Sequence, residues 1–302
     1  MFDTHFDLLT ILYLAYINND FSYIKKLVYY FKKNKYKGLI ANLYFMSIRE
    51  MKEELGNYFT DPISMFKIST SLCKKYFKDY KIYYSIEGAD YINTCDLQSL
   101  KEMGLSSILI VWNNLNKYGG GAKSKSKLTN LGKDFIKECM RLNLYIDLSH
   151  TNKRTFYDIY KLLKKHNYNK VIVSHSNYYG LCKNRRNINK YQIKCIKKLN
   201  GLIGLNMFNQ FIDNKAINIE LLRKKYLKHI KYMIKYRGLD GVSIATDNMM
   251  FFKLLNKDYK YLELFDLKNI KYDLESLLRN LFDKNETEKI LNNNAYYFME
   301  GD

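Results

Sequence analysis

The sequence predicts a (β/α)8 barrel of TIM type with parallel strands and an additional C-terminal helix, in a single domain over residues 1–302. Two observations lead to this prediction: apolar β-type runs alternate with helical segments, and several runs end in a metal-binding type of side chain. Strands buried on both faces should read as near-continuous apolar segments. Eight runs, the number that closes the barrel, have this character: Phe2–Asp7, Leu39–Ser47, Lys81–Glu87, Ser107–Trp112, Leu144–Ser149, Val171–Ser174, Leu202–Met207 and Val242–Thr246.

Helical segments lie between these runs. Residues 21–34 carry Ile24, Leu27, Val28 and Phe31 at the spacing of one helical face. Asn285 followed by Glu288 is typical of an N-cap with a capping glutamate and predicts the start of a last helix. The other expected helical segments are Met51–Asp79 (one or two helices), Lys133–Arg141, Arg154–His166, Lys190–Leu199 and Glu220–Tyr236.

Length and composition fit a cytoplasmic globular protein. The chain has 302 residues, 47% of them hydrophobic, and a barrel of this kind needs about 250. No apolar run reaches the ~20 residues that span a bilayer, and Asp3 follows Met1 too closely for a signal peptide. The five cysteines form no C-x-x-C pair, so we expect reduced thiols that mostly fill the core.

The net charge of +20 favours either a nucleic-acid partner or a lysine-rich surface from a biased genome. A nucleic-acid footprint should be clustered, whereas the lysines here spread over every predicted helix. We therefore expect no specific nucleic-acid partner and no membrane contact.

Polar side chains at the strand ends predict a metal centre. Asp3, His5 and Asp7 alternate with other residues, so they should share one face of the first strand, where His5 and Asp7 would bind one ion. A short polar N-terminus explains them equally well. Glu87 ends another run and has two oxygens with which to bridge two ions, although a solvated loop glutamate is the simpler interpretation.

His150 and His175 each close an apolar run in successive βα units, within reach of one ion, and neutral imidazole is the usual nitrogen ligand of zinc. A single histidine there would more often be structural. Asp247 ends the eighth run either as a helix N-cap or as an acid/base group. The remaining histidines, His166 and His229, fall in lysine-rich segments and are predicted to lie on the surface.

The motifs resemble, in order, those of the membrane (renal-type) dipeptidase family, peptidase family M19, within the amidohydrolase-like barrels. The resemblance runs nearly end to end and rests on these segments: Asp3-Thr-His5-Phe-Asp7, Ile86-Glu-Gly-Ala-Asp90, Trp112-Asn-Asn, Gly119-Gly-Gly-Ala122, Leu128-Thr-Asn-Leu-Gly132, Ile146-Asp-Leu-Ser-His150, Val173-Ser-His-Ser176, Leu181-Cys182 and Arg186-Asn187.

This resemblance implies a zinc-dependent dipeptidase (a metalloprotease-type hydrolase of small peptides) with two zinc ions per chain, although the same ligands would also suit Mn or Fe. One ion would take His5 and Asp7, the other His150 and His175, with Glu87 bridging them and a bridging hydroxide attacking the peptide bond. Asp247 would carry the proton. Arg186 would hold the substrate's terminal carboxylate, beside Trp112 and Asn113. A homodimer is expected from the resemblance alone.

Two departures from the family pattern bear on substrate choice. Trp112 stands where many relatives have histidine; it cannot ligate a metal, but its indole N–H can donate a hydrogen bond. Met249 and Met250 replace a common Asp-Gly pair. They motivate an alternative, a binuclear amidohydrolase acting on an N-acyl amino acid, a β-lactam-like ring or a modified biosynthetic peptide. A basic binding protein without activity is disfavoured, because all five expected metal ligands are present.

Overall fold

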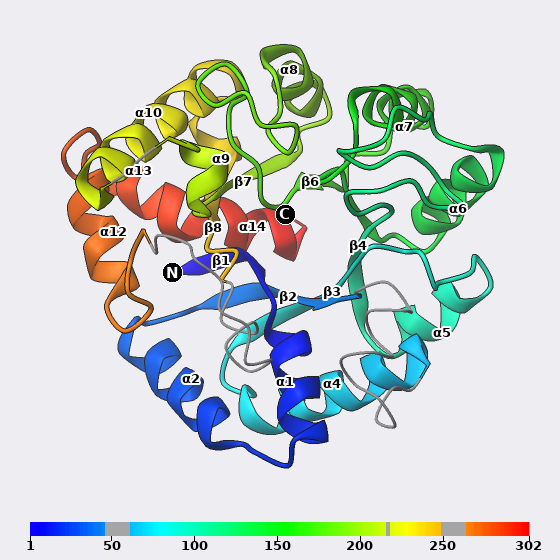
Figure 1. The fold of residues 1–302 in the computed structure, drawn as a ribbon, viewed down its shortest axis with the longest axis horizontal. Helices are drawn as coiled ribbons and strands as arrows, with labels where there is room; N and C mark the ends of the chain where they lie inside the picture. Colours follow the sequence, from blue (N-terminus) through cyan, green and yellow to red (C-terminus); the bar gives the residue numbers. More distant parts are fainter. Residues whose placement is uncertain (46–60, 216–217, 249–263, 302) are drawn as a thin grey trace.

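Eight parallel strands form a closed barrel in the computed structural model, which describes residues 1–45, 61–215, 218–248 and 264–301. The strands pair in sequence order, and β8 pairs with β1 to close the cylinder (Figure 1). Every predicted strand is confirmed, and each begins within two residues of its predicted start. The strands are β1 (Phe2–Phe6), β2 (Gly38–Tyr44), β3 (Lys81–Glu87), β4 (Leu105–Leu109), β5 (Tyr145–Asp147), β6 (Val171–Val173), β7 (Leu202–Asn206) and β8 (Val242–Ala245).

Helices form the outer ring around the strands (Figure 1). They pack by amphipathic faces, as in α7, where Phe156, Ile159 and Leu163 are buried at helical spacing. The described helices are α1 (Leu8–Ile17), α2 (Ser22–Lys33), α4 (Pro62–Tyr76), α5 (Asp96–Glu102), α6 (Asn130–Arg141), α7 (Lys153–Lys165), α8 (Lys190–Lys198), α9 (Asn209–Ile212), α10 (Ile219–Arg237), α12 (Ile270–Leu278), α13 (Lys284–Glu288) and α14 (Asn294–Glu300), with a 3₁₀ turn η2 (Leu239–Gly241) and a π-helical turn η3 (Lys289–Asn293).

Two helix predictions need correction. The cap of the last helical segment is Asp283 with Glu286, not Asn285 with Glu288, because Asp283 is the residue with extended backbone whose side chain accepts from the N–H of Glu286. Helix α1 was not predicted at all. Its side chains are buried from Leu8 to Ala15, so it has no polar face and its sequence shows no helical period. Residues 46–47 at the end of the predicted second strand and residues 51–60 of the predicted helical segment Met51–Asp79 lie outside the described residues.

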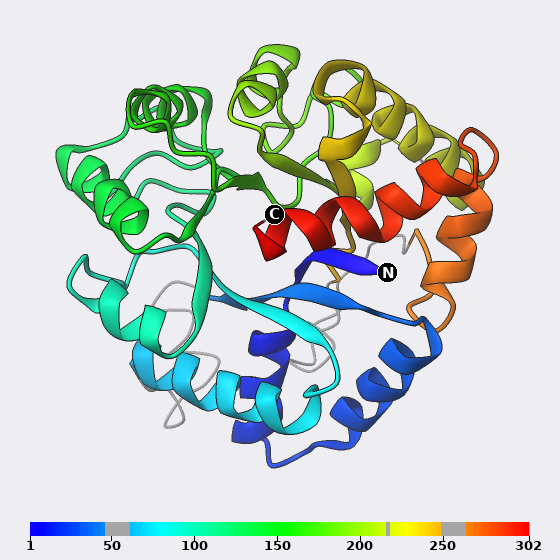
Figure 2. The same cartoon turned by 180° about the vertical axis from the view of Figure 1, so that it is seen from behind.

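The C-terminal helix α14 closes one end of the barrel. Its Ala295 and Met299 pack against Phe2, Tyr145 and Leu202, which lie at the first residues of their strands or next to them. Figure 2 shows α14 crossing the barrel on the face turned toward the viewer. The amino-terminal mouth is therefore filled by a small apolar cluster, and the carboxyl ends of the strands are left for a site, as in barrels of this type.

The cysteines agree with the prediction: all five are free, and Cys73, Cys139 and Cys182 are buried. Among the described residues, no helix combines the length and the apolar character needed to cross a bilayer. His166 is exposed, as predicted, but the prediction for His229 is wrong. The His229 ring is fully buried, accepts the N–H of Tyr178 at Nδ1 and lies 3.0 Å from the carbonyl of Ile212 at Nε2. It ties α10 to the end of α9 and to the loop that follows β6.

Protonation of His229 should destabilise the protein in acid. Burial lowers the pKa of His229 from 6.5 to about 4, so the unfolded chain takes up a proton at a higher pH than the folded one. Its contribution is constant above pH 6.5 and is lost as the pH falls toward 4, by about 3 kcal/mol. We expect His229→Gln to flatten the dependence of the unfolding free energy on pH in urea titrations. His166→Gln is the exposed control, and an equal effect of both substitutions would contradict this assignment.

Candidate metal centre

The five predicted metal ligands converge at the carboxyl-terminal end of the barrel. His5 Nε2 lies 3.2 Å from Glu87 Oε2, while Glu87 Oε1 lies 2.8 Å from His150 Nε2 and 3.5 Å from His175 Nε2. Asp7 Oδ1 is 3.9 Å from His5 Nε2. All five side chains are buried, and their ligand atoms fall into groups within 4.8 Å of one another. Glu87 therefore directs one oxygen toward His5 and the other toward the pair of histidines.

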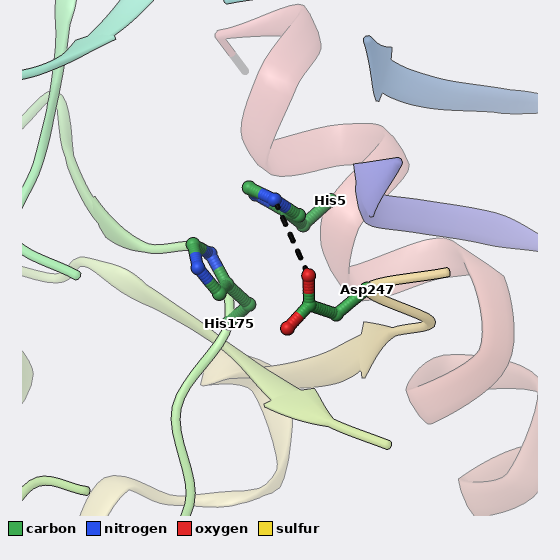
Figure 3. A group of neighbouring side chains, drawn as sticks. All are labelled: His5, His175 and Asp247. Atoms are coloured by element: carbon green, nitrogen blue, oxygen red, sulfur yellow. Dashed lines mark ion pairs between the residues drawn. The ribbon is translucent and has the colours of Figure 1, made fainter. Parts of the chain in front are cut away.

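Asp247 faces the same cluster from the end of β8. Its Oδ1 lies 3.7 Å from His5 Nε2. The dashed line in Figure 3 joins this pair, and the ring of His175 lies beside both residues. The second oxygen, Oδ2, accepts a hydrogen bond from the amide of Asn206 at 2.6 Å. The side chain of Asp247 is 13% exposed, more than those of His5, Asp7 and Glu87. One oxygen is thus held in place and the other is directed at the cluster.

The β1 residues reach the site through an irregular strand. The pairing with β2 shifts between Asp3 and Phe6, which lie three residues apart but pair with Leu39 and Ala41, two residues apart. The alternation of side-chain directions on which the prediction relied is therefore interrupted within β1. His5 and Asp7 still meet, but Asp3 does not join them. Its carboxylate accepts from the N–H and hydroxyl of Thr246 and from the N–H of His5. Asp3 ties β1 to β8 beneath the site.

Two site residues have a left-handed backbone conformation that residues other than glycine rarely adopt. The φ angles are 64° for His150 and 45° for Asp247. Histidine and aspartate tolerate the left-handed region better than most residues, and such strain collects at functional sites. Both conformations turn a side chain inward directly after a strand end. A sequence alone does not reveal φ, so this feature became visible only in the fold.

The electrostatics of the cluster favour bound cations. Burial alone would lower the pKa of His5, but the carboxylates of Glu87, Asp247 and Asp7 outweigh it and raise that pKa to about 10. Burial lowers the pKa values of His150 and His175 well below the usual range and keeps both rings neutral, as metal ligands must be.

The carboxylates of Asp7, Glu87 and Asp247 lie in this cluster near one buried permanent cation, the Arg186 guanidinium. His5 Nε2 and Asp7 Oδ1 find no hydrogen-bond partner among the described residues. Buried charges are normally paired or bind metal. The donor set, with imidazole nitrogens and carboxylate oxygens, fits divalent ions such as zinc.

Each of the three histidines has its other ring nitrogen held by a neutral side chain. His150 Nδ1 lies 3.1 Å from Asn113 Oδ1, His175 Nδ1 lies 2.7 Å from Ser174 Oγ, and His5 Nδ1 lies 2.5 Å from the Asn42 amide. The oxygens of Asn113 and Ser174 can accept a hydrogen bond from Nδ1–H, which leaves Nε2 of His150 and His175 unprotonated and free to bind a metal, whereas the Asn42 amide nitrogen donates to Nδ1 of His5. Asn42 and Ser174 were not among the predicted site residues, since strand-interior polar residues carry no motif of their own.

Removing the Asn113 acceptor should weaken metal binding. In Asn113→Ala the His150 Nδ1–H loses its partner, and loss of such a contact typically costs about 10–100-fold in metal affinity. Asn113→Asp keeps an acceptor oxygen and should retain most of the affinity. Competition with a chelator of known affinity measures both variants. Equal affinities of Asn113→Ala and the parent protein would contradict the role of this contact.

A cavity of about 530 Å³ opens over the cluster, within the size range of small-molecule sites. Trp112, a predicted substrate contact, lines it, and the centroid of its ring lies 5.7 Å from that of His150, with an angle of 28° between the two planes. Arg186 lines it too, with its guanidinium over the Phe211 ring. Burial lowers the pKa of Arg186 to about 10, so it stays charged, and its Nε and Nη1 have no partner among the described residues. Met249 and Met250 lie outside the described residues.

Comparisons with known proteins agree with this geometry. The sequence model of the membrane dipeptidase family (peptidase family M19) matches residues 64–300. Two curated relatives are "uncharacterized protein in PQQ-III 3′ region" of Acinetobacter calcoaceticus (30% identical over 168 residues, 52% of each chain) and "uncharacterized protein in pqqA 5′ region" of Klebsiella pneumoniae (31% over 162 residues, 50% of this chain and 58% of that one). The chain thus spans between half and three fifths of the length of these relatives.

A solved structure extends the similarity over nearly the whole chain. It is a metallo peptidase from Rhodobacter sphaeroides liganded with a phosphinate mimic of the dipeptide L-Ala-D-Ala, with a TM-score of 0.77 and 19% identity over 99% of this chain and 98% of that one. At this identity the likeness concerns the fold. The family match begins after β1, and the barrel itself brings His5 and Asp7 to the matched residues Glu87, His150 and His175. This chain belongs to the membrane dipeptidase family, peptidase family M19.

Proposed function

We propose that this protein is a metal-dependent dipeptidase that hydrolyses the peptide bond of small dipeptides, including those with a D-residue at the C-terminal position, with two zinc ions per chain. The observation that carries the proposal is the buried cluster of His5, Asp7, Glu87, His150 and His175 on the floor of a small-molecule cavity. Family membership and the dipeptide mimic bound to the Rhodobacter sphaeroides peptidase support it.

The ligand geometry supports two ion positions. His5 and Asp7 would hold one ion, His150 and His175 the other, and Glu87 has one oxygen directed to each side. When bound, such ions lower the pKa of water toward 7 and polarise the scissile carbonyl. The protein side chains supply the orientation and the proton transfer.

Asp247 is placed to move protons. Its free oxygen, Oδ1, faces the cluster and would accept a proton from the attacking water and return it to the leaving amine. The Asn206 amide holds the other oxygen and so fixes the direction of the carboxylate. Asp247 also falls within ligand distance of His5 and His175, so it would remain close to the ion that His5 holds.

Arg186 would bind the substrate's terminal carboxylate. The Nε and Nη1 of its buried guanidinium have no partner among the described residues, so this cation has N–H donors left for a carboxylate. Its Nη2 donates to the carbonyl of His175, which fixes the guanidinium relative to a metal ligand. Trp112 and Phe211 would cover apolar parts of the substrate. Binding at a fixed distance from the ligands orients the scissile bond.

A substrate panel tests this proposal. Protein loaded with zinc is assayed on L,L- and L,D-dipeptides beside N-acyl amino acids, with Mn-loaded and chelator-treated samples as controls. We expect hydrolysis of dipeptides by the loaded protein and none after chelation. Activity confined to acylated amino acids would instead support the alternative, a binuclear amidohydrolase of other small amides. Trp112 motivates that alternative, because it presents a large indole over His150 in this cavity. A cytoplasmic location and a homodimer stay predictions.

A further inference from the structure

We propose that the preferred dipeptides carry a second carboxylate in the side chain of their C-terminal residue, and that a basic rim at the mouth of the cavity recognises it. This inference rests on the proposed function. We call the cavity over the metal cluster the catalytic cavity. The rim is defined by six side chains around this cavity and an adjoining one: Lys123, Lys183 and Arg185 line the catalytic cavity, and Lys125, Lys153 and Arg154 line its neighbour.

Apart from the buried Arg186, the charges of the catalytic cavity are segregated by depth, with the acids fully or largely buried and the bases exposed. Its acidic lining residues are Asp7, Glu87 and Asp247, all within the metal cluster. Every other charged residue that lines its described part is a lysine or an arginine. With the carboxylates matched by metal ions, the remaining field in the cavity is positive. Cavity walls of low dielectric concentrate such a field on a bound ligand.

The rim cations are available to a ligand. Within the described residues, no carboxylate lies within 4.0 Å of Lys123, Lys183 or Arg185, whereas Lys225 and Arg141 elsewhere are paired with acids. A chain with a net charge of +20 has unpaired lysines in many places. The rim differs from these because its side chains surround a cavity that contains the candidate metal ligands.

A second cavity of about 310 Å³ continues from the first and shares Ala122 and Arg185 with it. Its lining includes Lys125, Lys153 and Arg154 and, among the described residues, no acid. Arg154 donates to the carbonyl of Lys125, so the two chain segments are joined. A ligand that extends beyond the metal cluster therefore meets only positive charge.

The loop that carries Lys123 and Lys125 is anchored to the barrel. The Asn152 amide donates to the carbonyls of Ser124 and Ser126, and Gly121 forms a β-bridge with Thr151. A side chain at Gly121 would collide with the carbonyl of Trp112, at 1.8 Å from an added Cβ. This close packing places the loop beside α7 before any substrate arrives, so binding does not have to order it.

The position of the second carboxylate follows from Arg185 and Arg186. Arg186 is buried and would hold the terminal carboxylate, while its neighbour Arg185 is exposed and lines both cavities. Both arginines line the same cavity, Arg186 at the buried end and Arg185 at the exposed end, so a residue whose carboxylate is bound at Arg186 can extend its side chain toward Arg185. We therefore assign the extra charge to the C-terminal residue of the substrate.

Matched substrates isolate this charge. The zinc-loaded protein is assayed on Ala-Glu and Ala-Gln, which differ only by the charge of the side chain, with Glu-Ala and Gln-Ala as the reversed pair, each in L,L and L,D form. Each exposed ion pair contributes modestly, but three cations act on one carboxylate, so we expect kcat/KM for Ala-Glu to exceed that for Ala-Gln about tenfold. The ratio should collapse toward one near 1 M NaCl, where charges are screened within about 3 Å.

Two triple variants separate the local field from the net charge. Lys123→Gln, Lys183→Gln and Arg185→Gln together should reduce the Ala-Glu to Ala-Gln ratio to within about twofold of one. The control replaces Lys161, Lys164 and Lys165, exposed residues of α7 outside both cavities, and removes the same charge. It should keep the ratio. An equal loss in both variants, or a ratio near one in the parent protein, overturns the proposal, as does a preference for Glu-Ala over Ala-Glu.

A binding measurement keeps the inference separate from the proposed function. Phosphinate mimics of Ala-Glu and Ala-Gln are titrated into the zinc-loaded protein by calorimetry, which requires no turnover. A tenfold tighter Ala-Glu mimic without hydrolysis of any dipeptide would contradict the dipeptidase proposal and support the basic rim. Equal affinities of the two mimics would overturn the rim, whatever the activity.

Discussion

Replacing Asp247 by asparagine is expected to lower kcat/KM by about 10²–10⁴-fold and to leave metal bound, because the variant loses the carboxylate that would take and return the proton. Asparagine has the same shape and tolerates the left-handed backbone, with φ of 45°, that position 247 requires. Its side-chain oxygen can still accept from Asn206. Steady-state kinetics and metal analysis on the same preparation measure the two effects separately.

The result distinguishes a proton carrier from a metal ligand at position 247. Full activity in Asp247→Asn would rule out the proton transfer. Loss of activity together with loss of metal would instead make Asp247 a ligand, a role that its 3.7 Å distance from His5 Nε2 also permits. Asp158→Asn, the same chemical change on the outer helix α7, is the control and should leave both measurements unchanged.

Replacing Glu87 by glutamine is expected to abolish most of the stabilisation that zinc gives. A ligand present at 1,000 times its dissociation constant stabilises the folded state by about 4 kcal/mol, which corresponds to a rise in Tm of about 10 °C. Among the described residues, Glu87 directs one oxygen to His5 and the other to His150 and His175. Its neutral amide would face His5, His150 and His175 with a much poorer pair of ligand atoms.

Thermal unfolding with zinc and with a chelator measures this effect. The parent protein should show the shift, Glu87→Gln should show little of it, and metal analysis should give fewer ions per chain. Glu102→Gln, an exposed residue at the end of α5, makes the same chemical change away from the site. A zinc-dependent shift of equal size in Glu87→Gln and the parent protein would contradict the bridging position.

Local pattern carried most of the fold prediction. The runs Lys81–Glu87 and Val171–Val173 are short, apolar and bounded by polar residues, so β structure follows from the residues themselves. Predictions based on helical period failed where burial surrounds the helix. Helix α1 has no polar face, and α10 buries His229 although lysines surround it in the sequence. In both places the neighbouring elements decide which side chains are covered.

For the site, the sequence predicted which candidate ligands would lie together but not how they are held. The position of His5, Glu87, His150 and His175 at strand ends suffices, because the carboxyl ends of parallel strands meet at one rim. The contacts from Asn42 and Ser174 were not predictable in this way. Ser174 lies 3.4 Å from His5 Nδ1 across a separation of 169 residues, and no local pattern connects two such positions.

The eight strands, the order of the elements and the identities of the metal-type side chains were predictable without a structure, because each depends on residue type and spacing within a few positions. Three features became visible only in the folded barrel. They are the irregular β1 that separates Asp3 from the metal ligands, the strained backbone at His150 and Asp247, and the cavity with its acidic floor and its basic rim. These depend on distances between residues far apart in the chain, which only the packing of the strands and loops sets.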